Sequence, residues 1–152
     1  VVDHIRNFLS QVFDAMGLEV EILIKPSDEE NVYDVELKGN EMGVLIGKRG
    51  QTLDSLQYLT NLAINKHSET YTYTRVKLDT EDYRKRRKET LENLARNIAY
   101  KVKRTKKAVS LEPMNPFERR VIHSALQNDR YVSTHSEGDE PYRHVVITLK
   151  RQ

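Results

Sequence analysis

Apolar residues recur at steps of three and four along the first sixteen positions of the chain. The residues that make this pattern are Val2, Ile5, Phe8, Leu9, Val12, Phe13 and Met16. Such spacing places them on one face of a helix, which Gly17 would end. Alternating apolar and polar residues then predict two strands, at 20–26 and 32–37, joined by a polar turn. The chain therefore begins with a helix and a hairpin.

A helix–loop–helix pattern follows the hairpin. Residues 42–46 form a short apolar turn of helix, which the glycine-bounded segment 47–50 ends. The next amphipathic stripe consists of Leu53, Leu56, Leu59, Leu62 and Ala63. The segment 70–78 is rich in β-formers and predicts a third strand.

The second half begins with a long basic helix. It is predicted to start at Asp79 and Thr80 and to run to about Lys103. Its buried stripe is predicted to be Tyr83, Leu91, Leu94, Ile98 and Val102. The remaining segments predict a strand at 108–114, a helix at 115–128 that Asn115 caps and Pro116 begins, and strands at 131–138 and 143–151. The patterns together predict an α+β chain of two small modules, residues 1–79 and 80–152.

Charge is distributed unevenly along this chain of 152 residues, although its net charge is only +2. Residues 1–40 carry nine acids and three bases, whereas residues 84–107 carry eleven bases and two acids. A segregated field of this kind favours a polyanion at one surface and repels it at another.

Composition also excludes several classes of protein. The absence of cysteine excludes a disulfide framework and thiolate metal sites. No apolar run approaches the ~20 residues that cross a bilayer, and no signal-peptide pattern opens the sequence. We therefore expect a cytoplasmic protein without membrane insertion.

The segment Gly47-Lys48-Arg49-Gly50 is the strongest candidate for binding chemistry. Glycine permits a tight loop and close approach of a ligand backbone, and a helix start directs unpaired N–H groups toward an anion. Two cationic side chains at the tip can each meet a phosphate oxygen. Spacing excludes a Walker A loop and a dinucleotide fingerprint.

The stretch VLIGKRGQTL resembles the signature of a KH domain, whose Gly-x-x-Gly loop clamps about four nucleotides of a single strand. The order of elements is similar to the type II arrangement, with a three-stranded sheet and helices on one face. The resemblance implies an apolar groove for bases beside the loop, formed by Val44, Ile46 and Leu53 with part of the second strand.

A second signature lies at Arg119 and His123, four residues apart on one predicted helix face. Arginine suits phosphate, although His123 could instead satisfy a strand carbonyl and orient Arg119. The stretch 111–147 resembles the R-xxx-H (R-3-H) module, a small three-stranded sheet packed with helices that binds single-stranded nucleic acid. That resemblance makes Arg143 a further phosphate candidate.

A type II KH module followed by an R-xxx-H module resembles the bacterial Jag family, associated with the sporulation membrane insertase. The resemblance implies an RNA chaperone or post-transcriptional regulator affecting cell elongation, division and wall homeostasis. It also implies a complex with a small single-KH protein. A homodimer of this chain is a second possible assembly. The alternatives are an interaction module that recruits division or membrane-insertion proteins, and a binder of single-stranded DNA.

Catalytic and metal chemistry find no support in the sequence. The five histidines show no metal-ligand spacing, and no acid, base and nucleophile set converges, so we expect neither an enzyme nor a cofactor. Tyr71, Tyr73, Tyr131 and Tyr142 could stack on bases, but alternating strand tyrosines favour packing against a helix.

Overall fold

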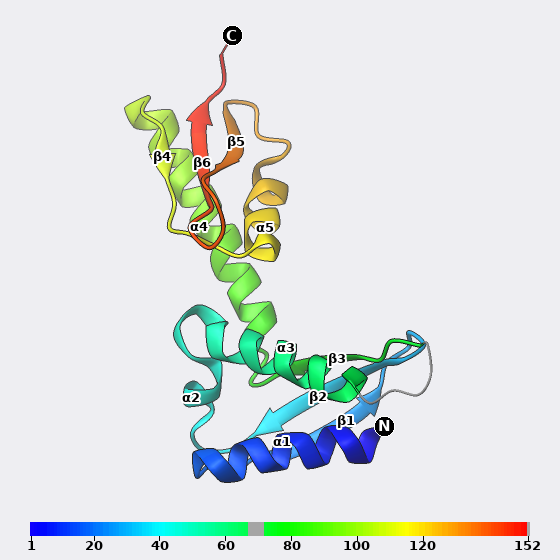
Figure 1. The fold of residues 1–152 in the computed structure, drawn as a ribbon. Helices are drawn as coiled ribbons and strands as arrows, with labels where there is room; N and C mark the ends of the chain where they lie inside the picture. The colour runs from blue at the N-terminus through cyan, green and yellow to red at the C-terminus, as the bar shows by residue number, and fades with distance from the viewer. Residues whose placement is uncertain (67–71, 152) are drawn as a thin grey trace. The chain divides into compact units, whose positions relative to one another are not determined.

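The computed structural model describes residues 1–66 and 72–151. Its contacts divide the chain into two compact units, residues 1–84 and 85–152. The first unit contains α1 (Val2–Met16), β1 (Glu21–Pro26), β2 (Val32–Lys38), α2 (Met42–Ile46), the 3₁₀ turn η1 (Lys48–Gly50), α3 (Gln51–Lys66) and β3 (Arg75–Asp79) (Figure 1). The predicted division between residues 79 and 80 stays a prediction.

The sheet of the first unit has the order β1-β2-β3, with β1 and β2 antiparallel and β2 and β3 parallel. Strand residues alternate between a buried face and a charged face, so Val35 and Leu37 point inward while Glu36 points outward. The core joins one face of the sheet to α1 and α3, through residues such as Ile5, Leu9, Phe13, Leu53, Leu56, Val76 and Leu78. A three-stranded sheet with helices on one face confirms the predicted fold of this unit.

The buried stripe of α3 differs from the predicted one. Leu53 and Leu56 are buried as expected, but Leu59 and Leu62 are 52% and 51% exposed, and Thr60 takes a buried position. The hydroxyl of Thr60 is satisfied within the helix, because it donates to the carbonyl of Leu56 at 2.7 Å.

Side-chain amides explain why α3 buries a different face from the predicted one. They form a ladder of hydrogen bonds between α3 and the edge of β3. Gln57 Oε1 accepts the N–H of Leu78 at 2.8 Å. Asn61 accepts the N–H of Val76 at 2.7 Å and donates to its carbonyl at 2.9 Å. Asn65 makes the same pair of bonds with Thr74, both at 2.8 Å. These amides replace the neighbouring strand that β3 lacks on this edge, and they turn the leucines outward.

The third strand and the following helix are shorter than predicted. β3 begins at Arg75, residues 72–74 have no regular structure, and residues 70 and 71 of the predicted strand lie outside the described residues. The helix α4 (Tyr83–Thr105) begins after a turn in which Glu81 and Asp82 have positive φ. The Thr80 hydroxyl is buried in this turn and donates to the carbonyl of Leu37 at 2.6 Å.

The second unit contains most of α4, then β4 (Val109–Ser110), α5 (Pro116–Leu126), β5 (Val132–Glu137) and β6 (His144–Leu149). Its antiparallel sheet has the order β4-β6-β5. The core joins this sheet to both helices, through Leu91, Ala95, Val102, Ile122, Leu126, Val132, Val145 and Ile147. A small three-stranded sheet packed with helices confirms the fold predicted for the second half.

Local details of this unit follow from the sequence only in part. Asn115 caps α5 by accepting the Glu118 N–H at 2.8 Å, as predicted. The predicted strand at 108–114 keeps only two residues in β4. The stripe of α4 is built on Leu91, Ala95, Ala99 and Val102, while Leu94 and Ile98 are only partly buried.

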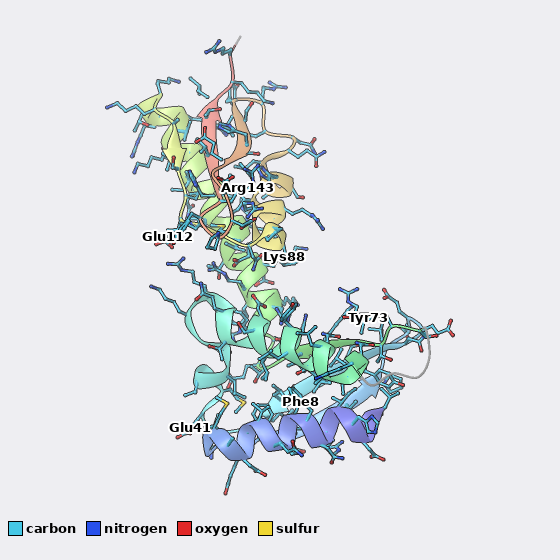
Figure 2. All side chains as sticks on the ribbon, in the orientation of Figure 1. Phe8, Glu41, Tyr73, Lys88, Glu112 and Arg143 are labelled. Atoms are coloured by element: carbon cyan, nitrogen blue, oxygen red, sulfur yellow. The ribbon has the colours of Figure 1, made fainter. Side chains whose placement is uncertain are left out.

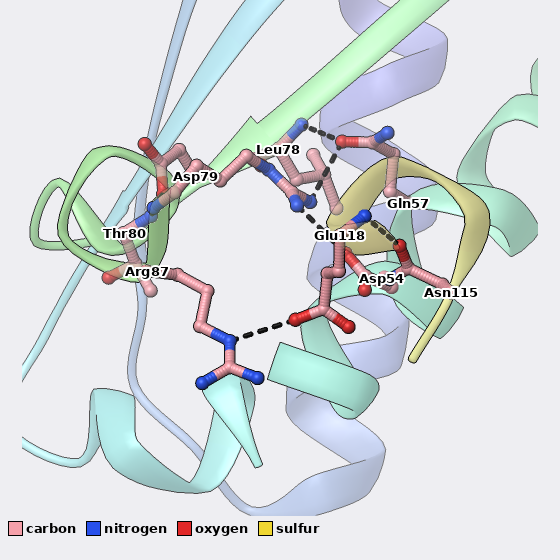
Figure 3. A network of polar contacts seen from close by, with 9 residues as sticks. Asp54, Gln57, Leu78, Asp79, Thr80, Arg87, Asn115 and Glu118 are labelled. Atoms are coloured by element: carbon pink, nitrogen blue, oxygen red, sulfur yellow. Dashed lines mark hydrogen bonds and ion pairs between the residues drawn. The ribbon is translucent and has the colours of Figure 1, made fainter. Parts of the chain in front are cut away.

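An ion pair joins the two helices of this unit. Arg87 Nε donates to Glu118 Oε2 at 2.8 Å, and both side chains are largely buried (Figure 3).

Within the described ranges, no helix has both the length and the apolar character that crossing a bilayer requires.

Candidate nucleic-acid interface

The glycine-bounded loop is a tight left-handed turn between α2 and α3. Gly47 ends α2 with φ 70°, and Arg49 and Gly50 have φ values of 56° and 76°. The Gly47 N–H donates to the carbonyl of Gly43 at 3.0 Å, which closes the last turn of α2. Three residues with positive φ in four positions turn the chain sharply before α3 starts at Gln51.

Both glycines are required by their neighbours within the unit. A Cβ on Gly47 would collide with the hydroxyl of Thr52. A Cβ on Gly50 would lie 2.5 Å from Cε1 of Tyr83, whose ring covers that glycine. Gly50 is therefore buried, which contradicts its expected role in admitting a ligand backbone. Lys48 is exposed at the tip, and Gly47 and Arg49 are half-buried.

The apolar groove is also revised by the structure. Val44 is exposed beside the loop and Ile46 is half-buried, so both can meet a ligand. Leu53 is completely buried in the core of the unit, where it anchors the start of α3. It is therefore wrong to count Leu53 among groove residues, because a fully packed side chain offers no surface to a base.

An arginine fixes the start of α3, and hence the loop, to the rest of the unit. Arg84 Nη1 donates to Asp54 Oδ1 at 2.8 Å and Nη2 donates to Gln57 Oε1 at 3.1 Å. Its Nε donates to the carbonyl of Leu78 at 2.8 Å. This network joins α3 to β3 and to the first turn of α4, so the loop is presented on a fixed frame.

The guanidinium of Arg119 makes its contacts within the second unit. The residue is only 8% exposed. Its Nη1 donates to the carbonyl of Met114 at 2.6 Å, and its Nη2 lies 2.7 Å from Glu140 Oε1. Arg119 therefore ties the start of α5 to the turn between β5 and β6. The expected direct contact with phosphate would have to displace Glu140.

His123 lies four residues further on and faces β5. Its Nδ1 is 2.7 Å from Thr134 Oγ1 and its Nε2 is 2.9 Å from Ser136 Oγ. The ring therefore bonds two hydroxyls, and not the strand carbonyl that the alternative interpretation predicts. Burial is the main cause that lowers the pKa of His123, and the nearby positive charge of Arg119 adds to it. The imidazole is therefore neutral at pH 7.

The two hydroxyl partners of His123 are site residues that the Arg119 and His123 signature does not itself include. Thr134 and Ser136 are two positions apart on β5, so they share one face of the strand. That alternation, and the place of both residues in the stretch 111–147 that resembles the R-xxx-H module, are the signals in the sequence that could identify them. Arg143, at the neighbouring turn, donates from Nη1 to the carbonyl of Gly138 at 2.8 Å and is half-buried (Figure 2).

The exposure of the tyrosines contradicts the prediction that they pack against a helix. Tyr73, Tyr131 and Tyr142 are all exposed, and Figure 2 labels Tyr73. Tyr71 and His67 lie outside the described residues. Exposed rings beside basic residues are suited to stacking on unpaired bases.

The depressed pKa of His123 predicts that acid weakens the fold. Below pH ~6.5 the unfolded chain binds a proton on this ring that the folded chain resists, so stability falls as pH drops. The loss has an upper limit of about 1.4 kcal/mol per pH unit, and solvent screening of this half-buried group reduces it. Urea unfolding at pH 7.5 and pH 5.5 measures the difference.

His123→Gln should lose less stability over this interval than the wild-type chain. The matched control is His4→Gln, at an exposed position on α1, which should keep the wild-type loss. An equal loss in His123→Gln and the wild type would contradict the assignment of the acid sensitivity to His123.

Comparisons with known proteins agree with this architecture. Residues 2–78 match the family described as "KhpA/KhpB, KH domain", and residues 89–149 match the R-3-H domain. The chain is 65% identical over 150 residues to "RNA-binding protein KhpB" of Clostridium symbiosum, covering 99% of this chain and 67% of that protein. It is 37% identical over 152 residues to the Bacillus subtilis protein of the same name, covering 99% and 71%.

A longer relative matches the same region. The chain is 43% identical over 146 residues to "RNA-binding protein KhpB" of Lactiplantibacillus plantarum, covering 95% of this chain but 44% of that protein. The matched region in each case takes in both units. The chain therefore belongs to the KhpB (Jag/EloR) family, in which a KH domain of the KhpA/KhpB type is followed by an R-3-H domain.

Proposed function

We propose that the chain is a non-enzymatic RNA-binding protein that holds single-stranded RNA with both of its modules. The observation that carries this proposal is the left-handed turn at residues 47–50, which presents Lys48 on a frame fixed by Thr52 and Tyr83. A preordered cationic turn loses little entropy when it takes a phosphate. The name of the relatives, RNA-binding protein KhpB, supports the same function.

The second module supplies a different kind of surface. His123, Thr134 and Ser136 form a row of polar groups along α5 and β5, with Arg143 at the adjacent turn. Arg119 acts here as a positioning residue, because its bonds to Met114 and Glu140 hold that turn in place. Exposed bases on α4 add attraction for a polyanion, namely Lys85, Arg86, Lys88, Arg96, Lys101 and Arg104.

Two modest sites on one chain gain from effective concentration, because the second contact becomes intramolecular once the first is made. We further propose a cytoplasmic RNA chaperone or post-transcriptional regulator with effects on cell elongation, division and wall homeostasis.

Direct binding measurements test this function. A labelled single-stranded RNA of about 12 nucleotides is titrated with the full chain, beside the same sequence as DNA and as duplex RNA. We expect the single-stranded RNA to bind tightest, with log affinity falling linearly against log salt. Equal affinity for DNA would favour the single-stranded DNA alternative, and absence of saturable binding at low salt would refute the function.

A second function, protein association through the KH domain, is favoured by one specific surface. Tyr58, Leu59 and Leu62 are large, exposed and spaced to share one face of α3. The amide ladder of the opposite face is what turns them outward. Because the matched KH family includes the KH domains of both KhpA and KhpB, we propose that a small single-KH protein covers this face. A second copy of this chain is the alternative occupant.

Negative charge on this face should weaken the association. Leu59→Asp combined with Leu62→Asp is expected to weaken binding of the single-KH protein at least about tenfold, because each buried leucine contributes about 2 kcal/mol. Calorimetry with the purified partner measures this, and sedimentation reports the homodimer. RNA affinity of the isolated variant should stay unchanged.

The matched control is Met16→Asp, at an exposed apolar position on α1. It should keep full association with the partner. If the α3 variant still binds the partner as tightly as the control, the partner does not dock on this face.

A further inference from the structure

Asp129 organises a cluster at the turn between α5 and β5. Its Oδ1 accepts the N–H groups of Tyr131 at 2.8 Å and Val132 at 3.1 Å. Its Oδ2 lies 2.9 Å from Lys103 Nζ, and its backbone carbonyl accepts Lys150 Nζ at 2.6 Å. One residue therefore ties together the end of α4, this turn and the segment after β6.

The carboxylate of this cluster is held in its charged form. Burial raises the pKa of Asp129, but the Lys103 ammonium and the two backbone N–H donors outweigh burial and lower it overall. Asp129 thus remains an anion over the physiological range, and its bonds hold the turn in one conformation.

Tyr131 is fixed by this cluster, yet its side chain is open to solvent. Its N–H is bonded to Asp129, and its carbonyl accepts the N–H of Lys150 at 2.7 Å. The residue is nevertheless 51% exposed, with Lys103 Nζ 5.6 Å from the centroid of its ring. An exposed aromatic ring on a backbone held at both its N–H and its carbonyl can stack on a flat ligand with little entropic loss.

A groove of about 400 Å³ lies beside His123. It lies between α5 and β5, and its lining runs from Thr134 to Val132, the residue that directly follows Tyr131. Lys150 also lines the groove, and its neighbour Leu149 pairs with Val132. Thr134 and Tyr131 are three chain positions apart, which is about 10 Å at the usual rise of a strand. The groove therefore contains the polar row at His123 and reaches Val132, the neighbour of Tyr131 in the chain, while the Tyr131 ring itself does not line it.

The surroundings of Tyr131 are strongly cationic. The three segments that Asp129 ties together, residues 103–107, 127–131 and 149–151, contain seven lysines and arginines against the single carboxylate of Asp129. A ring among cations matches the two parts of a nucleotide, since the base can stack while the phosphates meet positive charge. An acidic peptide would satisfy the charges but would make no use of the ring.

We propose that Tyr131 stacks on an unpaired base of a single-stranded RNA whose phosphates meet the lysines and arginines around the ring. The inference rests on the RNA-binding function proposed above and adds a base contact to it. Asp129 is a positioning residue in this site, because its carboxylate is bonded to the N–H groups of Tyr131 and Val132 and paired with Lys103.

Removing the ring should weaken RNA binding without changing its salt dependence. Tyr131→Ala is expected to lose about 5- to 150-fold in affinity for a single-stranded 12-mer, as for other stacked bases. The slope of log affinity against log salt should be unchanged, because no charge is removed. Tyr131→Phe is the matched control, which keeps the stacking face and should bind within about twofold of the wild type.

Parallel measurements separate this inference from the function on which it rests. If Tyr131→Ala binds RNA like the wild type while the Lys48 and Arg49 variant described below is impaired, the stacking site is wrong and the function stands. If the wild-type chain shows no saturable RNA binding, the function itself fails. A loss equal in Tyr131→Phe and Tyr131→Ala would also refute stacking.

Fluorescence gives an independent reading that does not depend on a loss of affinity. The chain contains no tryptophan, so Tyr131→Trp places a single indole at the platform. Its emission should be quenched when a 12-mer RNA binds and should change little with an abasic strand of the same length. Equal quenching by both strands, or none by either at saturation, would overturn the proposal.

Discussion

Changing Lys48 and Arg49 together to Asp is expected to weaken binding of single-stranded RNA by about a hundredfold near 0.1 M salt. Lys48 is exposed at the tip of the turn, and Arg49 lies beside it between two glycines. Reversal removes two cations and adds two anions where we place the phosphates. The slope of log affinity against log salt should fall by about 0.7 for each phosphate contact that is lost.

A matched charge reversal controls for the change in overall field. Lys38→Asp combined with Lys66→Asp alters the net charge equally at two exposed positions of the same unit. This control should lose only a small part of the affinity and keep the wild-type salt slope. If both double variants lose affinity equally, the loop acts only through overall charge and is not a clamp.

Gly50→Ala is expected to destabilise the first unit by about 2–4 kcal/mol. The new Cβ would lie 2.5 Å from Cε1 of Tyr83, and the backbone there has φ 76°. Both the steric clash and the left-handed conformation oppose any side chain. Urea unfolding followed by circular dichroism measures the loss.

Gly43→Ala is the matched control, because it adds the same methyl group to the helix just before the loop. Gly43 lies in α2, and a Cβ there would meet no atom within 4 Å. Alanine also favours the helix, so this variant should be as stable as the wild type or up to about 1 kcal/mol more stable. Equal stability of the two alanine variants would contradict the packing role of Tyr83 on Gly50.

The elements that sequence predicted correctly depend on neighbours in the chain. The helix at α1 follows from the spacing of Ile5, Leu9 and Phe13, and α5 begins where Asn115 can cap it. Both signals are local, because helix periodicity and capping involve residues within a few positions of each other.

The orientation of α3 could not be predicted in the same way. The spacing of its leucines predicted one buried face. In the structure Gln57, Asn61 and Asn65 form hydrogen bonds with residues up to 21 positions away, and the helix turns this amide face toward the sheet edge in place of Leu59 and Leu62. Amides at steps of four are ambiguous in a sequence, because only the partner strand reveals whether they face solvent or an unpaired sheet edge.

The candidate site shows the same division. Motif spacing located the loop and the Arg119 and His123 pair, since both signatures are contiguous in the chain. Motif spacing did not reveal that Glu140 forms an ion pair with the Arg119 guanidinium. It also did not reveal that Leu53 is buried in the core of the first unit. These facts depend on segments that meet only after folding.

For this protein the sequence by itself determined the order of helices and strands, the two motifs and the concentration of bases along α4. Only the tertiary structure decided which of the motif residues face solvent, why Gly50 lies beneath Tyr83, and that Tyr131 stands exposed on a turn held by Asp129. The physical reason is range: periodicity and charge are carried by adjacent residues, whereas burial and hydrogen-bond partnership are properties of surfaces brought together from distant positions.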